Sequence, residues 1–590
     1  MAAVDQHMHL LNKPQKFLQM KTYTLHVRMV SSIALACLGM GTTTLVSAQG
    51  SGTVGVSQAP AVLASTTPAK SPNPSQDARV VKAVSWDNSI DPQVNAMMEK
   101  AQASLLGQQL ANAQITEQEA QLTKALRDQG YLIGQVVVSA ADRAAFYQTG
   151  DLRLSIFLGK IGQIVVKNTS AVNSDWVQVV VDQNLCPNGV GNDCVLTKTN
   201  FERMTQLLYD TVGLQTGGLE FSSQGMPVGQ TQLTVTTLSK EAQIKGAVGA
   251  DNQGFSSTGQ YRLATSLSAN NLLGVGDVLG INLNVSNQGS VSGAIDLSGP
   301  LAANGLRWQG SVSRSQFSLP SYNNTSGFGN ALSLGVAYPL LRGLDQNWTA
   351  GLNAVVVATS SETGGVSTAN KTLQSGQLTV DGNSGDRSIL LGQNTWFFRS
   401  ALTVGQVMDD ANSLSSPYYE AVGGYTKLAF QGVGKIILSD AHSIYSVINI
   451  RGQAANTNLD AYERMMIGGY SGLRAYSVEQ GSINQGTISS LELRKAFNTE
   501  YGQFVPVIFA DYLNGWVTHG PDIGWQAATG YSNLNLTNHI VASDAGIGLD
   551  WNYFNKYSLS ASWAKRLPMS PAGTYGNGNS QFWFVAQVRF

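Results

Sequence analysis

The sequence predicts a membrane β-barrel of about 16 antiparallel strands that follows two small α/β domains. Three observations favour this fold class. Alternating apolar and polar residues fill the chain from 241 to 590, helical periodicity is confined to about 79 to 240, and the amino terminus is typical of an export signal. The composition agrees, because 12% of the 590 residues are charged and 62 are glycine. That balance suits neither a disordered chain nor an ordinary cytosolic enzyme.

The amino-terminal segment 1–48 predicts a cleaved signal peptide. Basic residues precede an apolar run over 29–45, and the small residues of a signal-peptidase site follow. Translation from Met1 and translation from Met20 both fit this pattern, and the second gives the usual signal length. Residues 49–78 are rich in Gly, Ser, Thr, Ala and Pro, so we expect a flexible linker there.

The next segment predicts two domains of about 80 residues each, 79–159 and 160–240, in which helices and strands alternate. Capping-box patterns mark one helix start in each domain, at Thr116 with Glu119 and at Thr199 with Glu202. The helix-prone stretch from 91 to 113 has two interpretations. It belongs to the first domain or it forms a plug helix in the pore.

Two cysteines, Cys186 and Cys194, flank a turn-rich segment of the second domain. An exported chain meets an oxidising compartment, so we expect a local disulfide between them. A zinc site would require further Cys or His residues nearby, and the sequence has none there. We therefore predict no metal and no cofactor.

The barrel prediction over 241–590 depends on two-faced strands. In Leu279-Gly-Ile-Asn-Leu-Asn-Val-Ser286 the odd-numbered residues are apolar, and the others are Gly, Asn or Ser. A soluble β-sandwich also alternates, but here the polar faces carry Arg and Asn, aromatic residues gather at strand ends, and the chain is exported. The last strand, 581–590, ends on Phe590 and must pair with the first, near 243–251, because hydrocarbon tolerates no open sheet edge.

One arginine and one aspartate occupy positions that such a barrel would enclose. Arg474 lies in the glycine-rich segment Ile467-Gly-Gly-Tyr-Ser-Gly-Leu-Arg-Ala-Tyr476, and Asp511 lies in an alternating strand. The simpler alternative is a surface arginine in a loop and an unrelated strand aspartate. The surrounding barrel favours an ion pair inside the lumen.

Several motifs, taken in order, resemble the two-partner secretion transporters, also called haemolysin secretion/activation proteins. In this family a barrel follows polypeptide-transport-associated (POTRA) domains. The ends of the two α/β domains resemble the POTRA endings of the family, and a family turn motif is matched without its proline. These segments read Gly130-Tyr-Leu-Ile133, Asp151-Leu-Arg-Leu-Ser-Ile-Phe-Leu-Gly-Lys160, Gly225-Met-Pro-Val-Gly-Gln-Thr-Gln-Leu-Thr-Val235 and Asn270-Asn-Leu-Leu-Gly-Val-Gly-Asp277.

The resemblance also extends to the arginine and the aspartate. The family has a Val-Arg-Gly-Tyr motif in a long loop that folds into the barrel, and Gly472-Leu-Arg-Ala-Tyr476 matches it, with Leu473 for valine and Ala475 for glycine. A Phe-x-Asp-x-Gly strand motif of the inner wall is matched by Phe509-Ala-Asp511, with the glycine displaced to Gly515. The resemblance implies that the loop Arg474 pairs with Asp511.

The function that the resemblance implies is secretion, or secretion with activation, of a dedicated large exoprotein such as an adhesin or haemolysin, without ATP. It implies a Gram-negative outer-membrane location, with the POTRA domains in the periplasm. The implied partners are the unfolded exoprotein in the periplasm, outer-membrane lipid and the barrel-assembly machinery that inserts the protein. The family works as a monomer.

Other function classes are disfavoured by what the sequence lacks. A formal net charge of −1 provides no positive electrostatic field that would attract nucleic acid. No phosphate-binding loop, G-x-S-x-G elbow or H-E-x-x-H helix is present, so we predict a non-enzyme. Two rival barrels remain. An outer-membrane protein insertase of the barrel-assembly type usually has more than two POTRA domains, and a passive porin needs none.

Overall fold

The computed structural model describes residues 78–87, 91–191, 194–240, 242–319, 324–409, 422–520, 538–567 and 579–590. The predicted signal peptide, 1–48, and all but the last residue of the predicted linker, 49–78, lie outside this part of the chain. The described residues form two compact units, one before residue 242 and one from Ala242 to Phe590. Among the described helices, none has the length and apolar character needed to cross a membrane.

The first α/β module has a three-stranded sheet in the order β2-β5-β4. Its strands are β2 (Ala83–Trp86), β4 (Gln135–Val137) and β5 (Asp151–Phe157), its helices are α4 (Pro92–Leu105), α5 (Asn112–Asp128) and α6 (Ala140–Thr149), and β1 (Arg79–Val80) pairs with β3 (Gln109–Leu110). Helix α4 places Val94, Met98 and Leu105 in the same core as Val84 and Leu152. The stretch from 91 to 113 is therefore part of this module.

The second module repeats the design with a sheet in the order β6-β8-β7. It contains β6 (Lys160–Asn168), α7 (Ser174–Leu185), α8 (Lys198–Asp210), β7 (Leu214–Ser222) and β8 (Gln230–Ser239). A disulfide joins Cys186 at the end of α7 to Cys194. The residues after Cys194 contact the first module, because the Lys198 amide donates a 2.7 Å hydrogen bond to the Gly130 carbonyl.

We expect the disulfide to stabilise the second module. Closing a loop with a sequence separation of 8 removes chain entropy from the unfolded state worth about 2–3 kcal/mol. A Cys186→Ser/Cys194→Ser variant should lose about that much free energy of unfolding, measured by urea denaturation of residues 78–240 expressed alone. The same denaturation with reductant on the unaltered protein is the control, and equal stability of all three samples would contradict the expectation.

Both predicted capping boxes are wrong in position. Helix α5 begins at Asn112, and the Ala111 amide donates to Gln114 Oε1 at 2.7 Å. Glu119 instead accepts from the Val138 amide and pairs with Arg143, so a tertiary contact takes the side chain that the pattern assigned to the helix start. In α8 the cap is Thr197, which accepts from the Asn200 amide at 3.2 Å.

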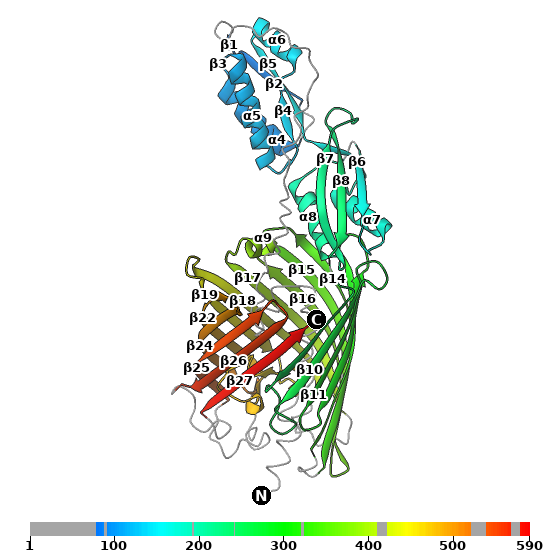
Figure 1. Cartoon of the computed structure of the whole chain (residues 1–590), viewed down its shortest axis with the longest axis vertical. Helices are drawn as coiled ribbons and strands as arrows, with labels where there is room; N and C mark the ends of the chain where they lie inside the picture. Colours follow the sequence, from blue (N-terminus) through cyan, green and yellow to red (C-terminus); the bar gives the residue numbers. More distant parts are fainter. Residues whose placement is uncertain are drawn as a thin grey trace. The chain divides into compact units, whose positions relative to one another are not determined.

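The second unit is a closed antiparallel barrel of sixteen strand positions (Figure 1), because β22 and β23 both pair with β24 and share one position. The predicted barrel fold class is confirmed. Its strands are β9 (Ile244–Asp251), β10 (Arg262–Asn270), β11 (Val278–Ser286), β12 (Val291–Pro300), β13 (Arg307–Leu319), β14 (Thr325–Arg342), β15 (Asn347–Thr363), β16 (Val366–Asn383), β17 (Thr395–Asp409), β18 (Gly423–Ser439), β19 (Ile444–Ala455), β22 (Gln485–Lys495), β23 (Phe497–Thr499), β24 (Gly502–Trp516), β25 (His539–Tyr553), β26 (Tyr557–Arg566) and β27 (Ser580–Arg589).

The barrel closes where the last strand meets the first. β27 pairs with β9 from Val585 opposite Asp251 to Arg589 opposite Ala247, and Phe590 exchanges backbone hydrogen bonds with Gly246. The predicted pairing of the carboxy-terminal strand is thus confirmed. We call the end of the barrel where β9 begins and β27 ends the first rim, and the opposite end the second rim. The short helix α9 (Gly385–Leu390) lies at the first rim (Figure 1).

The two faces of each strand differ as the alternation predicts. On β24, the odd-numbered residues from Val505 to Leu513 are buried, whereas Ile508 and Tyr512 on the other face are exposed. On β11, Ile281 and Leu283 are exposed, while the intervening Asn282 donates to Asp296 of β12 at 2.7 Å. On β11 the apolar face thus points outward and the polar face lines the lumen, as a transmembrane barrel requires. On β24 the inward face is also mostly apolar, because it packs against residues of the segment 465–483.

Candidate functional site: a loop held in the barrel lumen

The connection between β19 and β22, residues 456–484, is the centre of the candidate site, and we call it the lumen loop. It contains η1 (Ala461–Glu463), η2 (Val478–Gln480) and two short strands, β20 (Met465–Met466) and β21 (Ser482–Ile483), that pair with each other. It leaves and returns at the second rim, since β19 ends there and β22 begins there.

The tip of the lumen loop, residues 467–476, is a tight turn closed by its own backbone. The Leu473 amide donates to the Ile467 carbonyl, and the Gly469 amide donates to the Tyr476 carbonyl, both at 2.9 Å. A Cβ atom on Gly472 would lie 2.2 Å from the Ile467 carbonyl oxygen, so only glycine fits. Leu473, Ala475 and Tyr476 are buried in one apolar cluster with wall residues. The predicted motif therefore forms a compact head on the loop.

Strand register brings the wall residues to this head. Asp511 of β24 lies directly opposite Ser490 of β22, and Phe509 lies opposite Glu492. All four belong to the inward faces of their strands, because side chains alternate along a strand. The pairing of β22 with β24 thus gathers two acids, a hydroxyl and an aromatic ring on one patch of the lumen wall.

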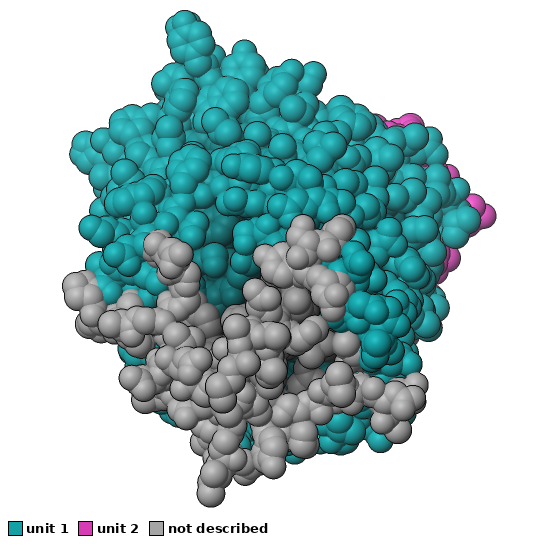
Figure 2. Space-filling model, turned by 90° about the horizontal axis from the view of Figure 1, so that it is seen from below, with its two compact units in different colours: residues 1–50, 242–590 teal, residues 51–241 magenta. Residues whose placement is uncertain are grey.

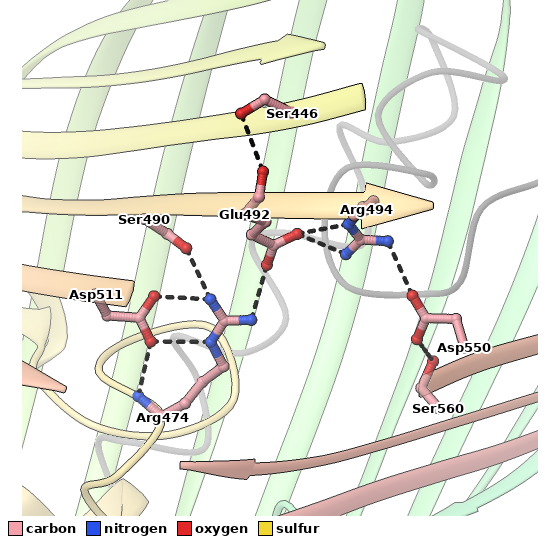
Figure 3. Close-up of polar contacts among 8 residues, drawn as sticks. All are labelled: Ser446, Arg474, Ser490, Glu492, Arg494, Asp511, Asp550 and Ser560. Carbon is pink, nitrogen blue, oxygen red and sulfur yellow. Dashed lines mark hydrogen bonds and ion pairs between the residues drawn. The ribbon is translucent and has the colours of Figure 1, made fainter. Parts of the chain in front are cut away.

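Arg474 enters this patch and is surrounded by acceptors (Figure 3). Its Nε and Nη2 donate to the two carboxylate oxygens of Asp511 at 2.9 and 2.7 Å, and the Arg474 amide donates to Asp511 Oδ2 at 3.3 Å. Nη1 donates to Glu492 at 2.7 Å and Nη2 also to Ser490 at 2.8 Å. The side chains of Arg474 and Asp511 are 9% and 0% exposed. The structure thus brings together the two residues that the sequence singled out, with a fork geometry that is specific to arginine.

The network continues from Glu492 along the wall. Glu492 also accepts from Arg494 Nε at 2.7 Å, Arg494 Nη1 donates to Asp550 at 2.9 Å, and Ser560 donates to Asp550 at 2.6 Å (Figure 3). Cations and carboxylates therefore alternate, so that each buried charge has an opposite neighbour. The family motifs indicated Arg474 and Asp511, but Glu492, Arg494 and Asp550 were not predicted.

Two further contacts that the sequence did not indicate hold the backbone of the tip. The Ala475 amide donates to Asp544 Oδ2 at 2.9 Å, and Trp583 Nε1 donates to the Arg474 carbonyl at 2.6 Å. Asp544 lies opposite Asp511 on β25, and Trp583 lies on β27. The alanine that replaces the usual motif glycine thus keeps its amide in use, and its side chain is fully buried.

Phe509, the other motif residue of the wall, lies under the guanidinium of Arg474. The Arg474 Cζ atom is 3.4 Å from the centre of the phenyl ring. The ring in turn occupies the space above Gly546, where a Cβ atom would lie 2.4 Å from Phe509 Cζ. Gly515, the displaced motif glycine, has a different role, because its missing Cβ makes room for Ile483 of the loop.

We expect Phe509→Leu to weaken the attachment of the tip without removing it. Loss of the cation–π contact in a desolvated site costs about 2 kcal/mol, which is less than the loss of an ion pair. The tip should leave the wall more often in this variant, measured by hydrogen exchange of the Arg474 and Ala475 amides in the purified protein. Phe509→Tyr, which keeps an aromatic face, is the control. Equal exchange rates for the leucine and tyrosine variants would contradict the expectation.

The part of the loop after the tip also contacts the barrel, near the strands β9 and β26 that flank β27. Glu479 accepts from the Ser257 amide at 3.1 Å and from the hydroxyls of Ser256 and Ser257 at 2.7 and 2.9 Å. These serines lie in the connection between β9 and β10. Arg566 of β26 donates to Gln480 at 3.3 Å and lies 4.2 Å from the ring centre of Tyr476. The motif tyrosine is thus part of the same attachment.

The other predicted site residues lie elsewhere. Cys186 and Cys194 are in the second α/β module, and Phe590 is at the first rim beside Gly246. Among the described residues, no group of three or more His, Cys, Asp or Glu side chains has an arrangement that could hold a metal ion.

Comparison with known proteins identifies the family. The sequence model described as "Haemolysin secretion/activation protein ShlB/FhaC/HecB" matches residues 229–533, which is just over half of the chain. The chain belongs to the haemolysin secretion/activation protein family. The match begins in the second α/β module and includes both the lumen loop and the wall motif.

Relatives of this haemolysin secretion/activation protein cover most of its length. The heme/hemopexin transporter protein HuxB of Haemophilus influenzae (strain 86-028NP) is 22% identical over 470 residues, which is 78% of this chain and 79% of the relative. Among solved structures, CdiB from Escherichia coli is similar with a TM-score of 0.66 and 18% identity, over 89% of this chain and 93% of CdiB. CdiB from Acinetobacter baumannii is similar with a TM-score of 0.61 and 16% identity, over 90% and 95% of the two chains.

The family assignment establishes the class of function. The protein is a two-partner secretion transporter, and its place is the outer membrane of a Gram-negative bacterium. Its family consists of transporters, and membership implies a dedicated exoprotein as the partner. A hollow among the atoms of this unit is visible when the molecule is seen from below (Figure 2).

Proposed function

We propose that the lumen loop is the gate of this transporter, closed by the attachment of Arg474 to Asp511 and opened when an exported chain displaces it. The observation that carries the proposal is the buried, two-pronged ion pair between the loop and the wall. A sixteen-stranded barrel is wide enough to leave an aqueous channel. Without an obstruction it would leak, and with a fixed obstruction no polypeptide could pass.

The strength of the attachment suits a gate that opens only for its substrate. Inside the lumen the pair is shielded from bulk water, so its electrostatic attraction is stronger than that of a surface pair. Glu492, Ser490 and the ring of Phe509 add further contacts to the same guanidinium. A release of the tip must break all of them together. Thermal opening is then rare, and binding of the exported chain has to compensate for the free energy of the broken contacts.

The two α/β modules are proposed to be the POTRA domains, 79–159 and 160–240, that receive the unfolded exoprotein in the periplasm. Each sheet has three strands, so strands at both edges lack one neighbour in the described sheets, among them β4 and β7. An extended peptide can add to such an edge through main-chain hydrogen bonds, which require little sequence specificity. This mode suits a long substrate that must be kept unfolded.

The exported protein is a large exoprotein, such as an adhesin or haemolysin, whose folding outside the cell drives its movement, so that transport needs no ATP. The transporter itself is proposed not to be an enzyme. It acts as a monomer, and the barrel-assembly machinery inserts it into the membrane.

The experiment that tests the transport role compares cells with and without this gene. We expect one large protein to disappear from the culture medium of the deletion strain while other outer-membrane barrels keep their abundance, measured by quantitative proteomics of both fractions. Reintroduction of the gene is the control. A joint loss of many barrels would indicate an insertase instead, and no change in either fraction would indicate a passive pore.

A further inference from the structure

Besides its tip, the lumen loop has a second polar attachment near the second rim. Asp460 Oδ2 lies 3.3 Å from Lys371 Nζ of β16, and these side chains are 0% and 1% exposed. Glu463 is paired with Lys427 of β18, whose Nζ also donates to the Glu463 carbonyl at 3.1 Å. The Tyr425 hydroxyl donates to Glu463 Oε1 at 2.9 Å. Two acids of one short turn thus meet two lysines of the wall.

The local sequence prepares this turn for the contact. Asp460 precedes η1 and accepts from the Tyr462 amide at 3.0 Å through Oδ1, which leaves Oδ2 for Lys371. The Glu463 amide donates to the Asp460 carbonyl at 2.9 Å and closes the turn. The Asp460 carboxylate is therefore held in place by the backbone of the turn itself, so that little side-chain entropy is lost when it pairs with Lys371.

Apolar packing reinforces the same place. Leu459, just before the turn, and Tyr462, within it, are buried in one cluster with residues of β15 to β18. Leu459 is fully buried. The wall residues of this cluster are Val357, Leu373, Val407 and Tyr425. Burial of these groups around the ion pairs excludes water, which strengthens the pairs and raises the cost of separating them.

Strand order shows how far apart the two attachments are. The tip is bound to β22, β24 and β25, and through Trp583 to β27. The turn is bound to β16 and β18. Around the closed barrel, the nearest of these strands, β18 and β22, are two positions apart, and the most distant, β16 and β27, are eight positions apart. The loop is therefore held by strands spread around the wall from β16 to β27.

We propose that Lys371 and Lys427 are positioning residues that hold the lumen loop across the pore, so that closure depends on the Asp460–Glu463 turn as well as on Arg474. The proposal rests on the proposed function, in which this loop closes the pore. Without the two lysine pairs the Asp460–Glu463 turn would be free to leave the wall, and the side of the lumen beside β15 to β18 would open.

The test measures ion conductance of purified full-length protein in planar bilayers. A Lys371→Met/Lys427→Met variant keeps the length of both side chains but leaves two buried carboxylates without their cations. We expect the fraction of time in the open state to rise on the order of a hundredfold. The variant Lys371→Asp/Asp460→Lys keeps this ion pair with its charges exchanged, so it should stay mostly closed. A variant that opened only because packing was lost would not be closed by the exchange. Lys556→Met, in the turn between β25 and β26 at the first rim, is the matched control.

Two comparisons make the outcomes decisive. If Arg474→Ala opens the pore but the lysine variant stays as closed as the unaltered protein, the second attachment is overturned and the proposed gate stands. If neither variant opens the pore, the loop does not close it, and both proposals fail. Folding is checked by heat-modifiable electrophoretic mobility. Should the lysine variant not fold, Tyr425→Phe, which removes one donor to Glu463, should raise the open fraction by about tenfold, and an unchanged open fraction would overturn the proposal.

Discussion

Replacing Arg474 with alanine is expected to open the pore to ions and to impair secretion of the exported partner, because the gate is no longer coupled to the passing chain, while the barrel remains folded in the outer membrane. The substitution removes the cation from the buried carboxylates of Asp511 and Glu492, and breaking such a pair typically costs about 3–5 kcal/mol. That loss falls on the attachment of the loop, because the strand pairing of β22 with β24 does not involve the guanidinium. The measurement is the amount of exoprotein in the medium together with the amount of transporter in the membrane fraction.

Matched variants distinguish the loss of the ion pair from the loss of side-chain volume and from the loss of a charge alone. Asp511→Ala should have the same effect from the other side of the pair. Arg474→Lys keeps the charge but cannot donate to both oxygens of Asp511 in a fork, so it should give intermediate secretion. Arg314→Ala removes an arginine that bonds Asn330 on another strand and should leave secretion unchanged. Normal secretion by both alanine variants of the pair would contradict a role of this attachment in transport.

The second large effect is expected from removal of the two α/β modules. A chain in which the signal peptide is joined directly to residue 242 should still form the barrel, since the barrel closes by pairing β9 with β27 and each unit has its own core. Secretion should fall to background, because no edge strand remains to receive the unfolded exoprotein. Pore conductance should persist, and this shows that the barrel is intact.

Two further variants lack one module each. Removal of either one should also reduce secretion, because their contact through Lys198 and Gly130 makes the remaining module incomplete at that surface. Secretion at the normal rate by the barrel alone would contradict the proposed receiving role of the modules.

The fold could be predicted from the sequence because its strongest signal is local. Alternation such as that of 279–286 fixes both the strand and its outward face, and the closure of β27 on β9 follows from the cost of an open edge in hydrocarbon. Helix starts were less predictable. Glu119, which the box pattern with Thr116 assigns to a helix start, instead binds Val138 and Arg143, and no short sequence pattern reveals such tertiary contacts.

The candidate site was predictable only in part for a related reason. Arg474 and Asp511 belong to motifs that resemble those of a known family, so they could be named in advance. Glu492 and Asp544 reach the same place through strand register, and Trp583 through barrel closure. Lys371 and Asp460 are 89 residues apart and carry no motif. Their meeting depends on how a long loop lies in the lumen, which periodicity does not encode.

The central claim, that the loop tip must leave the wall during transport, is tested most directly by locking it there. Ala475 and Asp544 are replaced with cysteine, since the Ala475 amide lies 2.9 Å from the Asp544 carboxylate, and a short thiol-specific linker that a reductant cleaves joins them in living cells. Cys186 and Cys194 are already joined and do not react. Each single cysteine variant, treated in the same way, is the control. We expect secretion to stop when the linker is in place and to resume when the reductant cleaves it, whereas undiminished secretion by the linked protein would show that the tip stays on the wall during transport.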